Sequence, residues 1–267
     1  MSKLIIFDTE TTGKEEEDKI IQVGAIVVDL KDSQYLKVYN ELCSSDIPIK
    51  LEAMAINGIR QEQIAGKKPF KETDFIKELN QLNREENYLI AHNLDFDLKM
   101  LEKEGFENKL KLLDTLQCAK HLFDIGDEIN NYKVANYKLQ TFRYMMFTQN
   151  DENVEAKKYG VEIKAHDAIG DVVILKLFLR ELYKKVIQKY GTKNPIEIMD
   201  KMVELTKTPI PVEKIIFPVG EYRGKKIIDI EKENPGLLTW YTTKYKNPQK
   251  EIVDAIKRLR KNGISSS

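Results

Sequence analysis

The feature that most constrains this chain is a pair of acidic residues at the end of an apolar run. Residues 4–7 are apolar, Asp8 and Glu10 follow, and a Thr/Gly-rich turn closes the segment at 11–13. An apolar run that ends in such a turn predicts a short buried strand. Residues two apart on a strand point to the same face. Two neighbouring carboxylates repel each other and lose hydration, and a divalent cation is the usual remedy. From this pair alone, a solvated strand end is an equally good interpretation.

Two later segments favour the metal site. Residues 88–101 read YLIAHNLDFDLKML, an apolar run followed by Asp97, and residues 166–172 read HDAIGDV, with His166 five residues before Asp171. Asp171 opens the apolar stripe of a helix predicted at 168–188, so its side chain is expected to point inward. The alternative for Asp171 is a carboxylate that stabilises the helix dipole from the first turn.

In order and spacing, the three segments resemble the motifs of the DEDDh 3′→5′ exonuclease family. This family includes the epsilon proofreading subunits of DNA polymerase III and exodeoxyribonuclease X-like proteins. The resemblance covers roughly the first 190 residues. It implies a ribonuclease-H-like fold, four acidic metal ligands and a histidine general base. The matching positions are Asp8, Glu10, Asp97, Asp171 and His166. The family pattern H-N-x-x-F-D places the ligand at Asp97 rather than at Asp95.

The residue types suit phosphodiester hydrolysis. Two divalent ions about 3.5–4 Å apart can activate a water, hold the phosphate and stabilise the leaving oxygen. As the resemblance implies, Asp8 bridges two Mg²⁺ (or Mn²⁺) ions, and the other three carboxylates complete their coordination. Oxygen ligands favour these ions over zinc. His166 suits the role of base because a histidine with an ordinary pKa of about 6.5 is mostly neutral at cytosolic pH. The expected products are nucleoside 5′-monophosphates.

Substrate contacts are predicted in three places. The first is the turn beside the metals, where small residues allow a strand end to approach. The second is Asn57, which stands where the family often has histidine in an H-G-I segment. The third is a basic hairpin tip in the C-terminal part. The predicted residues are Thr11, Thr12, Gly13, Asn57, Arg223, Lys225 and Lys226.

The order of predicted elements indicates an α/β fold, a ribonuclease-H-like mixed five-stranded sheet flanked by helices, plus a small C-terminal module. Strands are predicted at residues 3–8, 20–29, 35–43, 88–93 and 110–114, and helices at 71–82, 96–104, 115–123, 168–188 and 195–206. The predicted domains are an exonuclease domain at 1–190, a helical linker at 191–212 and a small basic module at 213–267.

Charge is distributed unevenly along the chain. Its 267 residues contain 43 Lys+Arg and 43 Asp+Glu, but residues 213–267 hold 12 basic and 7 acidic residues. An acidic body with a basic tail is compatible with metals in one part and phosphate contacts in the other. The tail resembles the module appended to exodeoxyribonuclease X-like proteins. Trp240 is expected in the core of this module, although stacking on bases is the alternative.

The leading hypothesis is a metal-dependent 3′→5′ exonuclease acting on single-stranded or frayed DNA ends in proofreading or repair, with a DNA polymerase as a candidate partner. One alternative is an RNA 3′-end trimming enzyme, because recognition of the 2′-hydroxyl depends on pocket geometry. The other is a non-catalytic, polymerase-associated nucleic-acid-binding subunit. Only two cysteines occur, and no leader or 18-residue apolar stretch is visible, so a soluble cytoplasmic protein is expected.

Overall fold

The computed structural model describes residues 2–31, 36–163 and 167–261. It divides into two compact units, which are described separately. The first comprises Met1–Leu122 and Gly126–Lys207, and the second comprises Phe123–Ile125 and Thr208–Ser267. The division after Lys207 falls inside the segment predicted as a linker. No helix in the described ranges combines the length and the apolar character needed to cross a bilayer.

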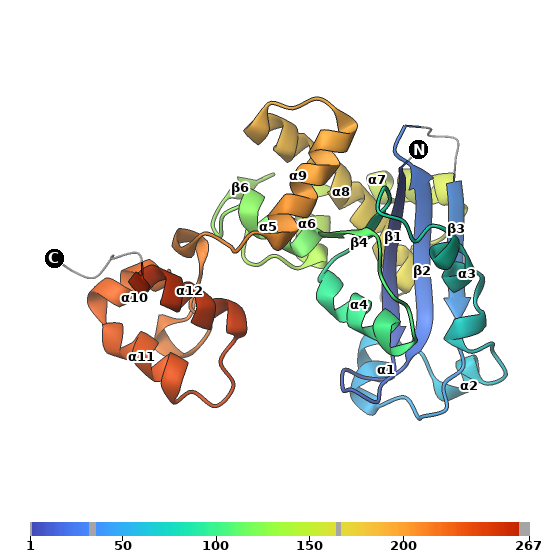
Figure 1. Cartoon of the computed structure of the whole chain (residues 1–267), viewed down its shortest axis with the longest axis horizontal. Coiled ribbons are helices and arrows are strands. Elements are labelled where there is room, and N and C mark those ends of the chain that lie inside the picture. The colour runs from blue at the N-terminus through green and yellow to red at the C-terminus, as the bar shows by residue number, and fades with distance from the viewer. Residues whose placement is uncertain (1, 32–35, 164–166, 262–267) are drawn as a thin grey trace. The chain divides into compact units, whose positions relative to one another are not determined.

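A mixed five-stranded sheet forms the centre of the first unit (Figure 1). The strands β1 (Lys3–Thr11), β2 (Ile20–Asp29) and β3 (Leu36–Leu42) form an antiparallel meander. The strands β4 (Tyr88–Ala91) and β5 (Lys111–Asp114) run parallel to β1, and the strand order is β3-β2-β1-β4-β5. This arrangement confirms the predicted fold class. Strand β2 forms where seven of ten residues are Ile, Val or Ala, and its observed bounds equal the predicted ones.

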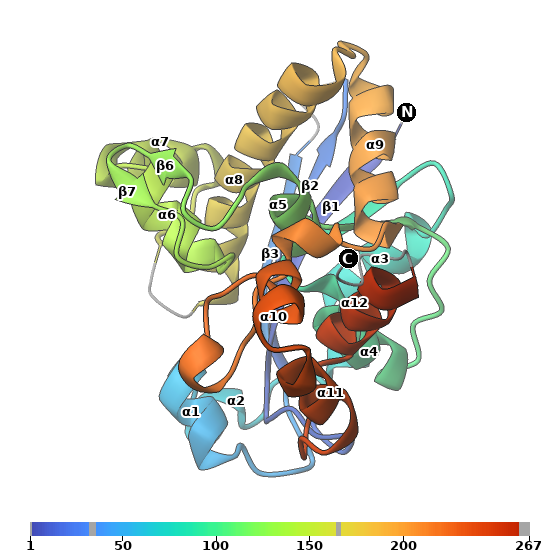
Figure 2. The same cartoon turned by 90° about the vertical axis from the view of Figure 1, so that its left-hand side faces the viewer.

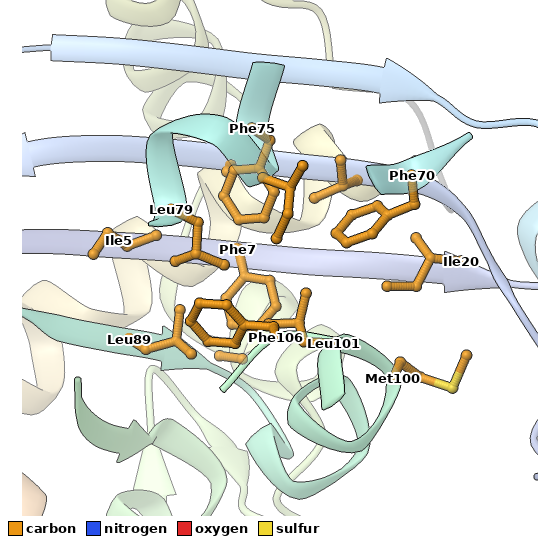
Figure 3. Packing of buried hydrophobic residues seen from close by; sticks show 14 of the residues in the cluster. Ile5, Phe7, Ile20, Phe70, Phe75, Leu79, Leu89, Met100, Leu101 and Phe106 are labelled. Carbon is orange, nitrogen blue, oxygen red and sulfur yellow. The ribbon is translucent and has the colours of Figure 1, made fainter. Parts of the chain in front are cut away.

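Alternation along β1 decides which side chains meet which helices. Ile5 and Phe7 point to one face, where they pack with Phe75 and Leu101 (Figure 3). That face is covered by α3 (Asp74–Gln81) and α4 (Leu94–Lys103). The opposite face of β1 and β2 is covered by the 23-residue helix α8 (Ala168–Tyr190), as the nearly edge-on view of the sheet shows (Figure 2). Asp8 and Glu10 belong to the face that α8 covers.

The remaining elements of the first unit border the sheet or support α8. Helix α6 (Leu139–Met146) stacks Phe142 on Phe178 of α8, with ring centroids 4.5 Å apart. Helix α7 (Gln149–Tyr159) and the short ladder of β6 (Glu128–Ile129) and β7 (Tyr132–Lys133) are not among the elements predicted from sequence. The other elements of the first unit are α1 (Leu51–Asn57), α2 (Gln61–Ile64), η1 (Phe70–Glu72), α5 (Thr115–Leu122) and α9 (Pro195–Lys207).

The second unit is a small helical module with its own core. It contains η2 (Val212–Lys214), η3 (Gly220–Tyr222), α10 (Ile227–Glu233), α11 (Pro235–Thr243) and α12 (Lys250–Lys261). Asn234 caps α11 by accepting a hydrogen bond from the Leu237 backbone N–H, and Pro235 occupies the first helical position. The core includes Phe217, Leu238 and Tyr241.

Candidate active site

A pocket of about 480 Å³ at the carboxyl end of β1 brings together the four acidic residues predicted as metal ligands, which come from three elements. Asp8 and Glu10 come from β1, Asp97 from the first turn of α4, and Asp171 from the first turn of α8. They lie up to 163 positions apart in the chain. All four carboxylates predicted from sequence therefore line one pocket.

Asp97 is positioned where β4 passes into α4. Asn93 begins the helix from a left-handed conformation with φ 74°, and its backbone N–H donates to Asp114. The Asp97 side chain is only 3% exposed, and its Oδ1 accepts hydrogen bonds from the Thr9 backbone N–H at 3.1 Å and the Thr9 hydroxyl at 2.6 Å. Asp95 is exposed on the same helical turn. The structure thus places Asp97, and not Asp95, in the pocket.

A glycine allows α8 to bring Asp171 close to β1. Gly24 lies opposite Asp8 in the β1–β2 register, and a Cβ there would overlap the backbone of Ala168 and Ile169. The start of α8 therefore lies directly on the β2 backbone. Sequence analysis missed Gly24, although a glycine inside a strand rich in β-branched residues is a signal of close backbone approach.

Two glutamines also hold the start of α8, and sequence analysis missed both. Gln22 donates from Nε2 to Asp167 Oδ1 at 2.5 Å and accepts from the Ala168 backbone N–H at 3.4 Å. Gln140 of α6 donates to Asp171 Oδ1 at 2.7 Å. A lone glutamine has no motif that would have indicated these contacts, because they depend on elements far apart in the chain.

The electrostatics of the pocket are unfavourable without a counter-charge. Burial, and then the charges of Asp97, Glu10 and Asp171, raise the pKa of Asp8 well above its usual value. Burial and the neighbouring carboxylates raise the pKa of Glu10 to about 8, against an opposing hydrogen bond from Asn57. Burial raises the pKa of Asp97 to about 7, although the Thr9 hydrogen bonds oppose it. The pocket is therefore built to attract positive charge near neutral pH.

The donor set fits hard divalent cations, because it consists of carboxylates that share one pocket. Within the described ranges, no three Asp, Glu, His or Cys side chains converge closely enough to hold an ion as they stand. Protein donors occupy some of the oxygens instead: Thr9 binds Asp97, and Gln140 binds Asp171. Binding a cation would therefore require these side chains to turn toward one another.

Two histidines bear on the assignment of a general base. His166, the predicted base, lies outside the described residues. His92 lines the pocket, but both of its ring nitrogens are engaged, Nδ1 with the Thr115 hydroxyl at 3.0 Å and Nε2 with the Tyr137 carbonyl at 2.9 Å. Because a carbonyl only accepts, Nε2 carries the proton. Burial lowers the pKa of His92 to about 4, so the ring is neutral and serves a structural role.

The predicted substrate contacts of the first unit fall into two groups. Thr11, Gly13 and Asn57 line the pocket. Thr12 does not: it is fully buried, and its hydroxyl donates to Asp18 at 2.8 Å. Thr12 therefore holds the turn in place.

A lysine that sequence analysis missed also borders the pocket. Lys50 lines it and forms an ion pair with Asp18 at 2.8 Å. A Cβ at Gly13 would overlap Asp18, so the glycine allows this close packing. The other predicted contacts, Arg223, Lys225 and Lys226, are exposed residues of the second unit. Lys225 pairs with Glu233 at 3.0 Å and lies over the ring of Tyr222.

Comparisons with known proteins agree with the geometry. Residues 5–178 match the family model described as Exonuclease (RNase_T). The chain is 33% identical over 142 residues to DNA polymerase III subunit epsilon of Treponema pallidum, which covers 50% of this chain and 62% of that protein. It is 24% identical over 259 residues to Exodeoxyribonuclease 10 of Escherichia coli K12, which covers 97% and 99%.

A solved structure shares the fold. Escherichia coli Exonuclease I in complex with a dA16 oligonucleotide aligns with a TM-score of 0.51 at 17% identity. The alignment covers 75% of this chain and 43% of that one.

Proposed function

This chain belongs to the exonuclease family and is a DEDDh-type 3′→5′ exonuclease, and we propose that it removes nucleotides stepwise from DNA 3′ ends in proofreading or repair. The observation that carries the proposal is the convergence of Asp8, Glu10, Asp97 and Asp171 on one pocket, where burial and the neighbouring carboxylates raise the pKa values of Asp8 and Glu10. A binding module has no use for such a costly cluster.

Members of this family depend on divalent metals, and the proposal assigns two Mg²⁺ or Mn²⁺ ions to the four carboxylates. When bound, such ions supply Lewis-acid activation of water and stabilisation of the leaving oxygen. Asp8 would be the central ligand, because the charges of all three other carboxylates act on it. In the metal-free pocket, Thr9 and Gln140 hold one oxygen each of Asp97 and Asp171 through the hydrogen bonds described above.

His166 is proposed as the general base. It precedes Asp171 by five residues in the chain, and Asp171 lines the pocket. A neutral imidazole there would accept the proton of the attacking water, a role that His92 is unable to fill because its ring is already engaged.

The proposed substrate contacts follow from the pocket lining and the charge of the second unit. Thr11, Gly13 and Asn57 would hold the terminal nucleotide. Arg223, Lys225 and Lys226 would contact phosphates of the same strand. Single-stranded or frayed DNA is preferred over RNA in this proposal, because the relatives are named as a DNA polymerase subunit and an exodeoxyribonuclease. The first name also supports association with a DNA polymerase.

The proposal places the protein in the cytoplasm. Cys43 and Cys118 are both free and buried, which suits a reducing compartment.

The test compares hydrolysis of 5′-labelled single-stranded DNA and of RNA of the same sequence, with Mg²⁺ and with a chelator. We expect a ladder of DNA products that shorten from the 3′ end only when Mg²⁺ is present. Faster hydrolysis of RNA would favour the 3′-trimming alternative. Strand binding without any hydrolysis would favour the non-catalytic alternative.

A matched pair of variants on one helical turn locates the chemistry. Asp97→Asn removes a charge from the pocket, whereas Asp95→Asn removes an exposed charge two residues away. We expect hydrolysis to be lost in Asp97→Asn and retained in Asp95→Asn. Equal activity in the two variants would contradict the assignment of the pocket.

A further inference from the structure

Trp240 lies on the surface of the second unit, contrary to the expectation that it belongs to the core. Its side chain is 41% exposed, whereas Leu238 and Tyr241 on the same helix are fully buried. Helix α11 therefore buries the face that carries those two residues and leaves the indole outside. An exposed indole presents a flat apolar ring on which a base can stack, so Trp240 is a candidate contact for a ligand.

The indole is held by a series of aromatic rings. Tyr245 packs against Trp240 in a T-shaped arrangement with ring centroids 5.3 Å apart, and Tyr245 stacks on Tyr241 at 5.0 Å with the planes 17° apart. Tyr241 in turn packs against Phe217 in the core at 5.0 Å. The backbone N–H groups of Lys244 and Tyr245 both donate to the Trp240 carbonyl. Trp240 is thus anchored, which lowers the entropy cost when a ligand stacks on it.

Two lysines follow Trp240 closely in the chain. Lys244 ends α11 one helical turn after the tryptophan, and Lys246 follows Tyr245. Across the described ranges, neither ammonium group forms a hydrogen bond or ion pair. Other cations of the unit are already engaged, such as Lys225 with Glu233 and Arg260 with Glu231. Lys244 and Lys246 are therefore available to an anionic partner.

We propose that Trp240, Lys244 and Lys246 form a binding site for single-stranded nucleic acid. The indole stacks on an unpaired base, and the two ammonium groups neutralise neighbouring phosphates. The net charge of +5 on residues 213–267 favours a polyanion over a protein partner, and lysine is depleted at the centres of protein interfaces. The inference rests on the proposed function in one respect: the substrate of the exonuclease would supply the single strand that binds here.

The chain contains a single tryptophan, so its fluorescence reports on this site directly. We would titrate the full-length protein with a 12-nucleotide single-stranded DNA, with Ca²⁺ in place of Mg²⁺ to prevent cleavage. We expect the oligonucleotide to quench the Trp240 emission, and a blunt duplex of the same length to quench it much less, because its base faces are covered. No change in emission while the oligonucleotide binds would overturn the inference.

Variants separate stacking from general charge. Trp240→Ala should weaken oligonucleotide binding on the order of 10-fold, within the range measured for removal of one stacked base, and Trp240→Phe should keep most of the affinity. Tyr144→Ala is the matched control, because Tyr144 is an aromatic residue of the first unit that is 73% exposed. Equal affinities of wild type and Trp240→Ala would reject the site.

The lysines are tested by the salt dependence of binding. The double variant Lys244→Gln, Lys246→Gln should reduce the slope of log affinity against log salt concentration by about 0.7 for each phosphate that is no longer neutralised. An unchanged slope would remove the lysines from the site. If the Trp240 emission changes with protein concentration but not with added oligonucleotide, the partner is a second copy of the chain. That result would overturn the proposal.

The measurements distinguish failure of the Trp240 site from failure of the proposed exonuclease function. An enzyme that hydrolyses DNA but whose emission ignores the oligonucleotide loses only this site. A protein whose emission is quenched but that hydrolyses nothing loses the exonuclease assignment and keeps this site.

Discussion

The two units of the molecule use charge in opposite ways. In the first unit, four carboxylates share one pocket, and burial together with repulsion between carboxylates raises the pKa values of Asp8, Glu10 and Asp97. In the second unit, charged groups lie at the surface, where several form opposite-charge pairs such as Lys225 with Glu233. A surface pair of this kind contributes little to stability, about 0–1 kcal/mol. The pocket costs stability, and an arrangement that costs stability is a better indicator of chemistry than one that does not.

The units also differ in how they expose their functional groups. The pocket of the first unit depends on contacts between distant elements, above all the approach of α8 to Gly24. The second unit presents Trp240 and its neighbouring lysines on one helix and the loop after it. Substitutions in the first unit should therefore change the reaction rate, whereas those in the second should change affinity.

The largest effect is expected from Asp8→Asn. Loss of the central ligand should lower the rate of hydrolysis by roughly 10³-fold or more. The metal-free protein should melt a few degrees higher, because one of several repelling carboxylates is gone and each kcal/mol corresponds to about 2–4 °C for a domain of this size. Hydrolysis and thermal melting of the same preparation test this. Near-normal activity, or unfolding of the variant, would refute the assignment of the pocket as a strained metal site.

His166→Ala should lower the rate by about 100-fold, within the usual range for loss of a general base. The wild-type rate should fall as the pH drops through the histidine pKa, and the variant should lose this dependence. The pH profile of hydrolysis between pH 5 and pH 8 is the measurement. The same profile for wild type and variant would show that another group takes the proton.

Gly24→Ala should slow hydrolysis by about 10- to 100-fold, because an added Cβ displaces the start of α8, and shifts of about 1 Å in a catalytic group carry effects of this size. Gly236→Ala in the second unit is the matched control, since a Cβ there has only ordinary contact with Asn234 at 3.5 Å. We expect the control to hydrolyse DNA at the wild-type rate. If both glycine variants behave alike, the close approach of α8 to β2 does not set the geometry of the pocket.

In the second unit, the double variant Arg223→Gln, Lys226→Gln should weaken binding of a long oligonucleotide several-fold and flatten its salt dependence by about 0.7 for each phosphate interaction removed. Lys225→Gln should have a smaller effect, because Glu233 already engages that ammonium group. Affinity measured at several salt concentrations tests both. A slower turnover of bound substrate, with affinity unchanged, would break the division of roles between the two units.

The smallest effect is a pH dependence of stability. Folding raises the pKa of Glu10 from 4.5 to about 8 and that of Asp97 from 3.8 to about 7, so the folded state binds more protons than the unfolded state between these values. This contribution to stability is fully present below about pH 4 and is lost as the pH rises to about 8. The metal-free protein should therefore melt a few degrees lower at pH 8 than at pH 5.

Mg²⁺ should restore the melting temperature that is lost at pH 8. Glu10→Gln should weaken the dependence of the melting temperature on pH. Glu155 and Asp18 have lowered pKa values, and their opposite contribution falls below pH 5. His92, whose pKa is lowered from 6.5 to about 4, adds stability as the pH rises to about 6.5. The larger raised pKa values of Glu10 and Asp97 outweigh this gain up to pH 8. Thermal melting with and without Mg²⁺ is the measurement. A metal-free melting temperature that rises from pH 5 to pH 8 would contradict the described electrostatics.

Much of the fold was predictable because its signals are local. Strand β2 was predicted with its observed bounds, and β1 and α8 within three residues at either end. Helix α7 was missed because it is mostly polar and has no apolar stripe, although Thr148 and Asp151 form a capping box that marks its start. Its stability comes from tertiary contacts such as the ion pair between Arg143 and Glu152.

The exposure of Trp240 shows why the rest was not predictable. Apolar and aromatic residues occur on several sides of α11, and a pattern of this kind does not indicate which side the core will cover. The packing of Tyr241 against Phe217 decided it.

The sequence by itself determined which acids can act together and in what order, because strand alternation and motif spacing are properties of short segments. Only the tertiary structure decided how closely those acids meet. Strand order places β1 between β2 and β4, Gly24 admits α8, and Thr9 and Gln140 orient two of the carboxylates. The raised pKa values follow from that proximity and from burial, because repulsion and loss of hydration act only once residues up to 163 positions apart share one pocket.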